Sequence, residues 1–130
     1  MAVNQAKVIQ GVGDSMYRQV RQNGYATAVQ TLMDMKILSK ADYERWRNGQ
    51  VPYLEKVCNI NLKKLASILE EMKRYAGRNG LKPSFTFYKQ WGRKNKPTVK
   101  LKFSKTGSEY MENLYATHYV KNTCGQVDHK

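Results

Sequence analysis

The chain has 130 residues, 41% of them hydrophobic and 11% aromatic, which fits one domain with enough apolar side chains for a core. It carries 23 Lys and Arg against 10 Asp and Glu, a formal net charge of +13, and its apolar content excludes a disordered polycation. No apolar run approaches the roughly 18 residues of a membrane span, and residues 1–15 lack the apolar centre of a signal peptide. We therefore expect a cytoplasmic protein with no membrane partner.

The cysteines and acidic residues give no sign of a metal or disulfide site. Cys58 and Cys124 form neither a CxxC motif nor a cluster with histidine, so we expect reduced thiols, with Cys58 small and buried. Glu70 and Glu71 are adjacent and point to different sides of their predicted helix. No glycine motif that holds a nucleotide phosphate occurs. We expect no cofactor and no metal.

The positive charge is concentrated in one stretch. Residues 73–105 carry 11 Lys and Arg and no Asp or Glu, a net charge of +11, whereas residues 1–72 carry +3 and residues 106–130 carry −1. A stretch without carboxylates repels itself, and a polyanionic partner would offset that repulsion. We expect nucleic acid, DNA or RNA, as the partner; the alternative is a basic surface that serves solubility alone.

Helical signals begin after a loose start. Residues 1–13 contain two glycines and no clean periodicity, so we expect them to be loosely ordered. Asp14 or Ser15 is expected to cap a short helix that reaches Arg21. A second helix is predicted over residues 25–35, where apolar residues recur at the i, i+3, i+4 spacing of one helical face.

Two or three further helices follow. Ser39 begins a variant capping box and predicts a third helix that ends after Arg47. Pro52 suits the first turn of another helix, and the strongest helical pattern runs from Asn61 to Ala76. Whether Pro52 to Ala76 forms one helix or two stays open.

The hydrophobic period changes to two after residue 80. Alternation over residues 85–91 and 99–103, with a turn-rich segment between them, predicts an antiparallel hairpin. Lys89 has the parity of the core-facing residues, so it emerges at an edge or the register shifts there. The core-facing side chains are predicted to be Phe85, Phe87, Trp91, Val99, Leu101 and Phe103, and the outer ones Thr86, Tyr88, Lys100 and Lys102.

Ser108 is predicted to cap a last short helix that ends near Lys121. The expected fold class is α+β: a helical N-terminal body of four to five helices, then the two-stranded antiparallel hairpin and a short C-terminal helix. We expect a single compact domain over residues 1–122 and a polar tail over residues 123–130.

The second and third predicted helices are compatible with a helix-turn-helix. In that interpretation the third helix offers Lys40, Arg45, Trp46 and Arg47 to DNA. Its carboxylates at Asp42 and Glu44 would face phosphates unfavourably. The alternative is that the aromatic pair, Tyr43 and Trp46, docks the helix into the core.

The candidate nucleic-acid site is the helix end and hairpin of the basic stretch. The hairpin tip can follow a phosphate backbone, where Lys and Arg displace condensed counterions. Tyr88 on the outer face can stack on a base or, alternatively, pack on a neighbouring helix. Arg74 can equally serve the dipole of its own helix end. The candidate residues are Arg74, Arg78, Lys82, Tyr88, Lys89, Arg93, Lys94, Lys96, Lys100, Lys102 and Lys105.

His118 is the one histidine expected in a structured region. Beside Tyr115, Tyr119 and a lysine it could act as the general acid or base of a small metal-free ribonuclease. A lone histidine on a helix is more often structural, and we expect no enzymatic activity.

Three stretches resemble a group of small uncharacterised basic proteins carried by bacterial phages and mobile elements: "ADYERWRNGQVPYLEKV" (41–57), "GLKPSFTFYKQWGRK" (80–94) and "LKFSKTGSEYMENLYATHYV" (101–120). The resemblance assigns no residue roles, because that group has no established activity. It implies a setting in which accessory proteins are DNA-binding regulators or inhibitors of host defence. A basic inhibitor of the second kind, similar in role to an anti-CRISPR protein, would bind a host nucleoprotein complex or an acidic protein surface.

Overall fold

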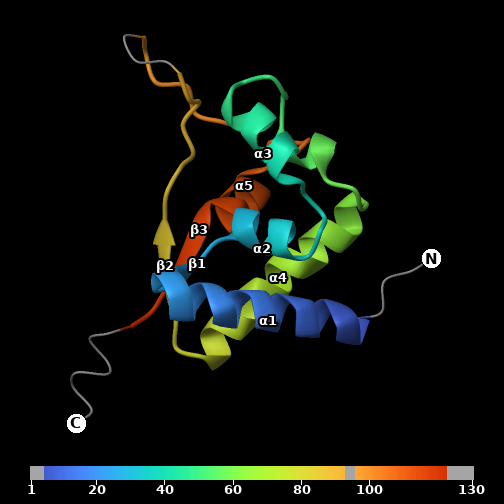
Figure 1. Cartoon of the computed structure of the whole chain (residues 1–130), viewed down its shortest axis with the longest axis vertical. Coiled ribbons are helices and arrows are strands. Elements are labelled where there is room, and N and C mark those ends of the chain that lie inside the picture. Colours follow the sequence, from blue (N-terminus) through green and yellow to red (C-terminus); the bar gives the residue numbers. More distant parts are fainter. Residues whose placement is uncertain (1–4, 93–95, 123–130) are drawn as a thin grey trace.

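Helices fill the first half of the chain, and a small sheet ties its end back to its beginning (Figure 1). The computed structural model describes residues 5–92 and 96–122, and its α+β architecture agrees with the expected class. The helices in these ranges are α1 (Gln5–Asn23), α2 (Ala28–Asp34), α3 (Lys40–Arg47), α4 (Leu62–Arg78), α5 (Glu109–Ala116) and the short 3-10 helix η1 (Leu54–Val57). The strands are β1 (Tyr25–Ala26), β2 (Lys82–Phe85) and β3 (Thr117–Val120).

α1 begins at Gln5, so the expectation of a loose segment up to residue 13 and a helix start near Asp14 was wrong for the described residues. Val8, Val12 and Met16 are buried at helical spacing and pack α1 against the rest of the core. Gly11 helps this packing, since a Cβ there would lie 3.0 Å from Cε of Met35.

Local capping residues set the starts of the next helices. The Thr27 hydroxyl accepts a hydrogen bond from the Gln30 amide at 3.0 Å, so α2 begins at Ala28 and residues 25–26 join the sheet, not the helix predicted over 25–35. Ser39 caps α3 as predicted, and Asn61 caps α4. The segment after Pro52 forms a separate 3-10 turn, so Pro52 to Ala76 contains two helical elements.

The sheet has the order β1-β3-β2 with both pairings antiparallel. Its central strand, β3, occupies positions that the sequence analysis assigned to the last helix, so that helix was predicted too long. Ser108 caps α5 as expected, but the helix ends at Ala116. Thr117 follows with extended backbone, and its hydroxyl donates a hydrogen bond to the Asn113 carbonyl at 2.7 Å. The aromatic and β-branched residues of β3 then satisfy their backbone groups on two neighbouring strands.

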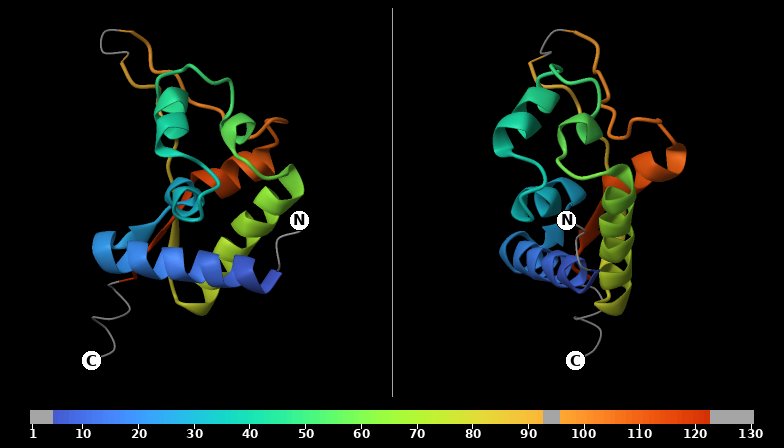
Figure 2. Two further views of the ribbon diagram at one scale, coloured as in Figure 1. Left: turned by 45° about the vertical axis from the view of Figure 1, so that its right-hand side comes forward. Right: turned by 90° about the vertical axis from the view of Figure 1, so that its right-hand side faces the viewer.

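The predicted hairpin is present only as a short arm, which we define as residues 86–92 and 96–101. The two segments share one isolated bridge, between Lys89 and Lys100, and hydrogen bonds such as Leu101 N to Tyr88 O at 2.8 Å. Figure 2 shows the arm projecting from the body at the end opposite α1 and α4. The ladder of the expected hairpin is thus replaced by a three-stranded sheet and an irregular arm.

Side-chain parity in the first segment of the arm is the reverse of the prediction. Phe85, Phe87 and Trp91 are 69%, 52% and 42% exposed, whereas Tyr88 is only 9% exposed. The Tyr88 ring turns inward because it packs on Trp46 of α3, at 5.7 Å between ring centroids, and on other aromatic rings of the core. Of the side chains predicted to face inward after the tip, Leu101 and Phe103 are buried and Val99 is partly buried.

Two glutamates, the buried Glu55 and the partly buried Glu112, hold the segment that follows the arm against the body. Glu55 accepts a hydrogen bond from the Tyr115 hydroxyl at 2.7 Å and one from the Lys105 amide at 2.8 Å. Glu112 accepts from the amides of Phe103 and Ser104. These hydrogen bonds fix residues 103–105, which connect the arm to α5.

Candidate nucleic-acid interface and the pockets around Arg47

The candidate residues lie in two separate groups, which follow different elements of Figure 1. One group surrounds the end of α4 and the start of β2, and contains Arg74, Arg78 and Lys82. The other follows the arm and its return, and contains Tyr88, Lys89, Lys96, Lys100, Lys102 and Lys105. Arg93 and Lys94 lie outside the described residues. The basic stretch is continuous in sequence, but it does not form one cluster.

The arginines at the end of α4 hold a buried carboxylate. Glu71 is 2% exposed; its Oε1 lies 3.0 Å from Arg74 Nε and its Oε2 lies 3.1 Å from Arg78 Nη2. Each arginine side chain is more than half exposed. Glu70, as predicted, points elsewhere and accepts a hydrogen bond from Tyr110. The α4 group therefore has a structural task that the sequence analysis did not anticipate.

The lysines of the arm group are mostly exposed, and one aromatic prediction fails. Lys89, Lys96 and Lys100 all face solvent. The Lys102 ammonium lies 5.8 Å from the centroid of the Tyr53 ring and donates to the Lys105 carbonyl at 3.1 Å. Tyr88 packs in the core, which was the stated alternative to stacking on a base. The exposed rings near these lysines instead belong to Phe85, Phe87 and Trp91.

Arg47, at the end of α3, lies among aromatic rings from two elements. Its guanidinium carbon is 4.8 Å from the centroid of Trp91, 5.0 Å from that of Tyr88 and 6.0 Å from that of Tyr43. The Trp91 amide donates to the Arg47 carbonyl at 2.7 Å, which fixes the arm against α3. Cation–π contacts of this kind are worth about 0.5–2 kcal/mol each, so Arg47 helps to order the arm. The Arg47 side chain is only partly buried, so its charge stays near the surface.

Two pockets share Arg47 as a lining residue. We call the first the inner pocket; its volume is about 410 Å³, and Tyr25, Tyr88 and His118 also line it. The second, the arm pocket, measures about 590 Å³ and is lined by Arg47, Lys89, Gln90, Trp91, Gly92, Lys96 and Thr98. Neither lining contains an Asp or Glu. Both pockets therefore favour an anionic ligand.

The ring of His118 is held between tyrosines in the inner pocket. Tyr25 stacks on it with centroids 5.6 Å apart and planes at 15°, and the Tyr88 hydroxyl lies 3.1 Å from Nε2. Burial lowers the pKa of His118 and raises the pKa of Tyr88 to about 12. Burial thus favours the neutral forms of both groups, and the Tyr88 hydroxyl and His118 Nε2 share one hydrogen bond.

The neighbours expected for a catalytic His118 are elsewhere. Tyr115 is buried on α5 and donates to Glu55, and Tyr119 has the opposite parity on β3 and so points to the other face of the sheet. His118 itself is on a strand, not on the predicted helix. The arrangement on which the ribonuclease hypothesis depended is absent from the described residues.

The α3 helix is docked by its aromatic residues. Trp46 is fully buried and donates from Nε1 to the Lys102 carbonyl at 2.8 Å. Arg45 forms an exposed ion pair with Asp42 at 2.9 Å. Trp46 docks α3 in the core, as the alternative interpretation held, and rings enclose Arg47, whereas Lys40 and Arg45 are exposed.

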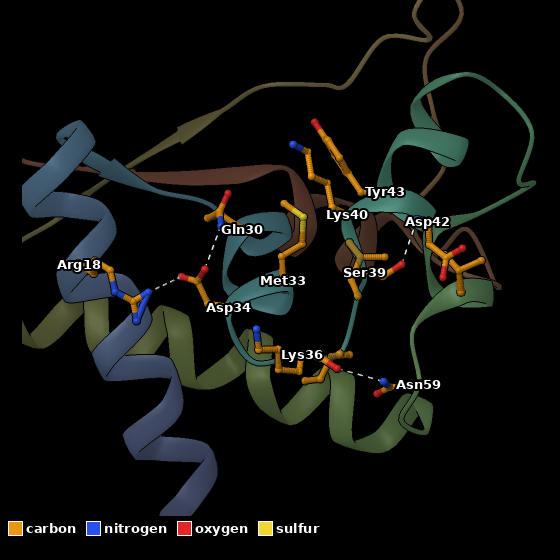
Figure 3. Close-up of a pocket in the computed structure, with 13 residues that line it drawn as sticks. Arg18, Gln30, Met33, Asp34, Lys36, Ser39, Lys40, Asp42, Tyr43 and Asn59 are labelled. Carbon is orange, nitrogen blue, oxygen red and sulfur yellow. Dashed lines mark hydrogen bonds and ion pairs between the residues drawn. The ribbon is translucent and has the colours of Figure 1, made fainter.

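A larger pocket of about 930 Å³ lies between α1, α2 and α3 (Figure 3). Several of its polar groups already bond to one another. The Asp34 carboxylate accepts from Arg18 at 3.1 Å and from the Gln30 side chain at 2.9 Å, and the Asn59 side-chain amide donates to the Lys36 carbonyl at 3.0 Å. A polar ligand would have to compete with these bonds. The pockets at Arg47 are therefore the better candidates.

No family model, curated protein or solved structure matches the chain. Within residues 5–92 and 96–122, no group of histidine, cysteine and acidic side chains is arranged to hold a metal ion. In the same ranges no helix combines the length and apolar character needed to cross a membrane.

Tyr25, Tyr43 and Arg47 were not predicted to share a site with His118. Tyr25 lies on β1, Tyr43 and Arg47 lie on α3, and His118 lies on β3. Only the tertiary fold brings these four residues together. One signal for the exposed aromatic residues was present: Lys89 shares their parity, and a lysine seldom points into a core.

Proposed function

We propose that the protein binds nucleic acid, DNA or RNA, through the arm and the adjoining strand β2. The observation that carries this proposal is the row of exposed side chains at alternate positions: Phe85, Phe87, Lys89 and Trp91. Phe85 ends β2, Lys89 forms the bridge to Lys100 and Trp91 begins a turn, and the buried Tyr88 separates the exposed Phe87 and Lys89. Rings interleaved with a cation can stack on bases while the ammonium neutralises phosphate, each stacked base contributing about 1–3 kcal/mol.

Charge around this row supports the same function. Lys82 at the start of β2 and Lys96 and Lys100 in the arm are exposed, and residues 73–105 contain no carboxylate. Phosphate contacts by these lysines would release counterions and give binding that weakens with salt. A role as a regulator carried by a phage or mobile element fits this activity, as the resemblance implies.

The test is fluorescence anisotropy with labelled duplex DNA, single-stranded DNA and structured RNA at several salt concentrations. The variant Lys89→Ala/Lys96→Ala/Lys100→Ala should weaken binding to all sequences, and should reduce the slope of log affinity against log salt by about 0.7–0.9 per lost contact. The matched control, with the same change in net charge, replaces the exposed lysines of other elements: Lys7→Ala/Lys56→Ala/Lys63→Ala.

The control should leave the slope close to that of the wild-type protein. Equal losses in the two triple variants would mean that only total charge matters, and absence of binding by the wild type would refute the proposal.

A second candidate function is binding to a protein partner, as in a counter-defence inhibitor. An apolar pocket of about 490 Å³ between α4, α5 and β2 favours it, with Pro83, Phe85, Tyr110 and Leu114 among its lining residues. Phe85 and Tyr110 are 69% and 53% exposed beside it. Exposed apolar groups around a groove are typical of protein interaction sites, and pull-down with a nucleoprotein complex would test this candidate if nucleic acid alone does not bind.

A further inference from the structure

The inner pocket combines a ring platform, polar groups and a cation in a space suited to a small ligand. Its volume of about 410 Å³ lies within the usual range for such sites, about 300–1,000 Å³. Tyr25, 40% exposed and backed by the His118 ring, offers a flat aromatic surface, and Gln30 and Thr86 add groups that can form hydrogen bonds.

Arg47 supplies an anion-binding group at this pocket. Among the described residues it forms no ion pair, and its side-chain hydrogen bond to the Tyr43 hydroxyl is long, at 3.4 Å. Within residues 5–92 and 96–122, its buried Nε has no hydrogen-bond partner. A buried guanidinium nitrogen left unsatisfied is costly. The flat cation is thus positioned by rings and not neutralised by a carboxylate, which suits it to a phosphate group.

The exposed row of the arm leads to this pocket. Phe87, 52% exposed, belongs to the row and also lines the inner pocket. On the other side of Arg47, the arm pocket adds Lys89 and Lys96. A chain of phosphates that follows the row can therefore pass Arg47 and continue along the arm.

We propose that the inner pocket receives one unpaired nucleotide of a single strand, with its base against Tyr25 and its phosphate against Arg47. The inference rests on the proposed nucleic-acid binding and narrows its ligand to single-stranded nucleic acid. A base inside a duplex is stacked on both faces and paired at its edge, so it cannot enter a pocket without leaving the helix. An unpaired base can stack on the tyrosine without that cost.

The experiment compares Tyr25→Leu with the wild type on a labelled single-stranded oligonucleotide and on a duplex of the same sequence. Affinity for the single strand should fall roughly tenfold with the loss of one stacked base, while affinity for the duplex changes by less than about twofold. A strand that contains the fluorescent base 2-aminopurine should be quenched by the wild type and much less by the variant.

The chain offers a matched control. Tyr17 and Arg21 on α1 form an exposed pair with the Arg21 guanidinium carbon 5.6 Å from the ring centroid. Tyr17→Leu and Arg21→Gln should leave single-strand binding unchanged, whereas Tyr25→Leu and Arg47→Gln should weaken it. Because Arg47 also orders the arm, Arg47→Gln is interpreted only if its unfolding midpoint is preserved; Tyr25→Leu decides the test in either case.

Two failures are distinguishable. If the wild type binds and the triple lysine variant weakens binding, but Tyr25→Leu binds single strands normally or loses duplex affinity equally, the single-nucleotide pocket is refuted and the proposed function stands. If the wild type binds no nucleic acid, both the single-nucleotide pocket and the proposed function are refuted.

Discussion

The arginines at the end of α4 were expected to contact phosphate, and their geometry predicts a large effect on stability instead. Arg74 and Arg78 are the two ion-pair partners of Glu71, whose side chain is only 3% exposed. Arg74→Ala/Arg78→Ala would leave this carboxylate buried without either cation, which costs about 3–5 kcal/mol. Glu71→Gln should cost less, about 1–2 kcal/mol, because the arginines are more than half exposed and return to water.

Urea unfolding followed by circular dichroism measures both effects. At an m-value near 2 kcal/mol/M, the double variant should lower the midpoint by roughly 1.5–2.5 M and Glu71→Gln by clearly less. Arg78→Ala alone provides a milder variant if the double variant does not fold. Arg45→Ala is the control, because its exposed pair with Asp42 should contribute at most about 1 kcal/mol.

A double variant with wild-type stability would show that Glu71 does not need either arginine. If such a variant also bound nucleic acid as weakly as the triple lysine variant of the arm, the arginines would be phosphate contacts, as the sequence suggested. We expect the reverse: a destabilised protein whose folded form keeps its affinity within about a factor of three.

Three further predictions concern the base of the arm and the inner pocket. Tyr115→Phe should lower the free energy of unfolding by about 1.5–3 kcal/mol in urea titrations, because the buried carboxylate of Glu55 loses a hydrogen bond; an unchanged midpoint would contradict this. Gly49→Ala should cost at least about 1–2 kcal/mol, since Gly49 has φ of 79° and a Cβ would lie 2.6 Å from the Gln90 amide carbon; amide exchange in the arm should rise with it. Burial lowers the pKa of His118 below its ordinary 6.5, so the unfolded state binds the proton more readily and stability should fall as pH drops below about 6.5, with no contribution from this group above it. The difference between the wild type and His118→Gln across that range isolates the effect, and a pH-independent difference would show that the histidine does not titrate.

Elements with local signals were predictable from the sequence. Ser39 and Ser108 each cap a helix at the expected place, because a cap depends on neighbouring residues only. The strand Thr117–Val120 was not predicted, because what makes it a strand is pairing with residues 25–26 and 82–85, which are distant in sequence. Tertiary pairing overrode a local helical pattern there.

The candidate site was predictable in its charge but not in its geometry. The excess of lysine between residues 73 and 105 is visible in composition, and several of these lysines are exposed. Composition does not indicate that Glu71 engages two of the basic residues, or that Arg47 meets rings from the arm. Those contacts depend on the packing of α4 and α3, which no local pattern specifies.

Lys89 shows how one residue decides between two surfaces. A strand on which Phe85, Phe87 and Trp91 face the core would point Lys89 to the same side, where an unpaired ammonium is costly. With the parity reversed, the lysine and the three rings all face solvent, and Tyr88 takes the inward position against Arg47. The reversal leaves apolar rings in water, a cost that stacking of bases would offset. The same backbone choice therefore creates the exposed row and orients Tyr88 toward the inner pocket, which links the proposed strand-binding surface to the proposed nucleotide site.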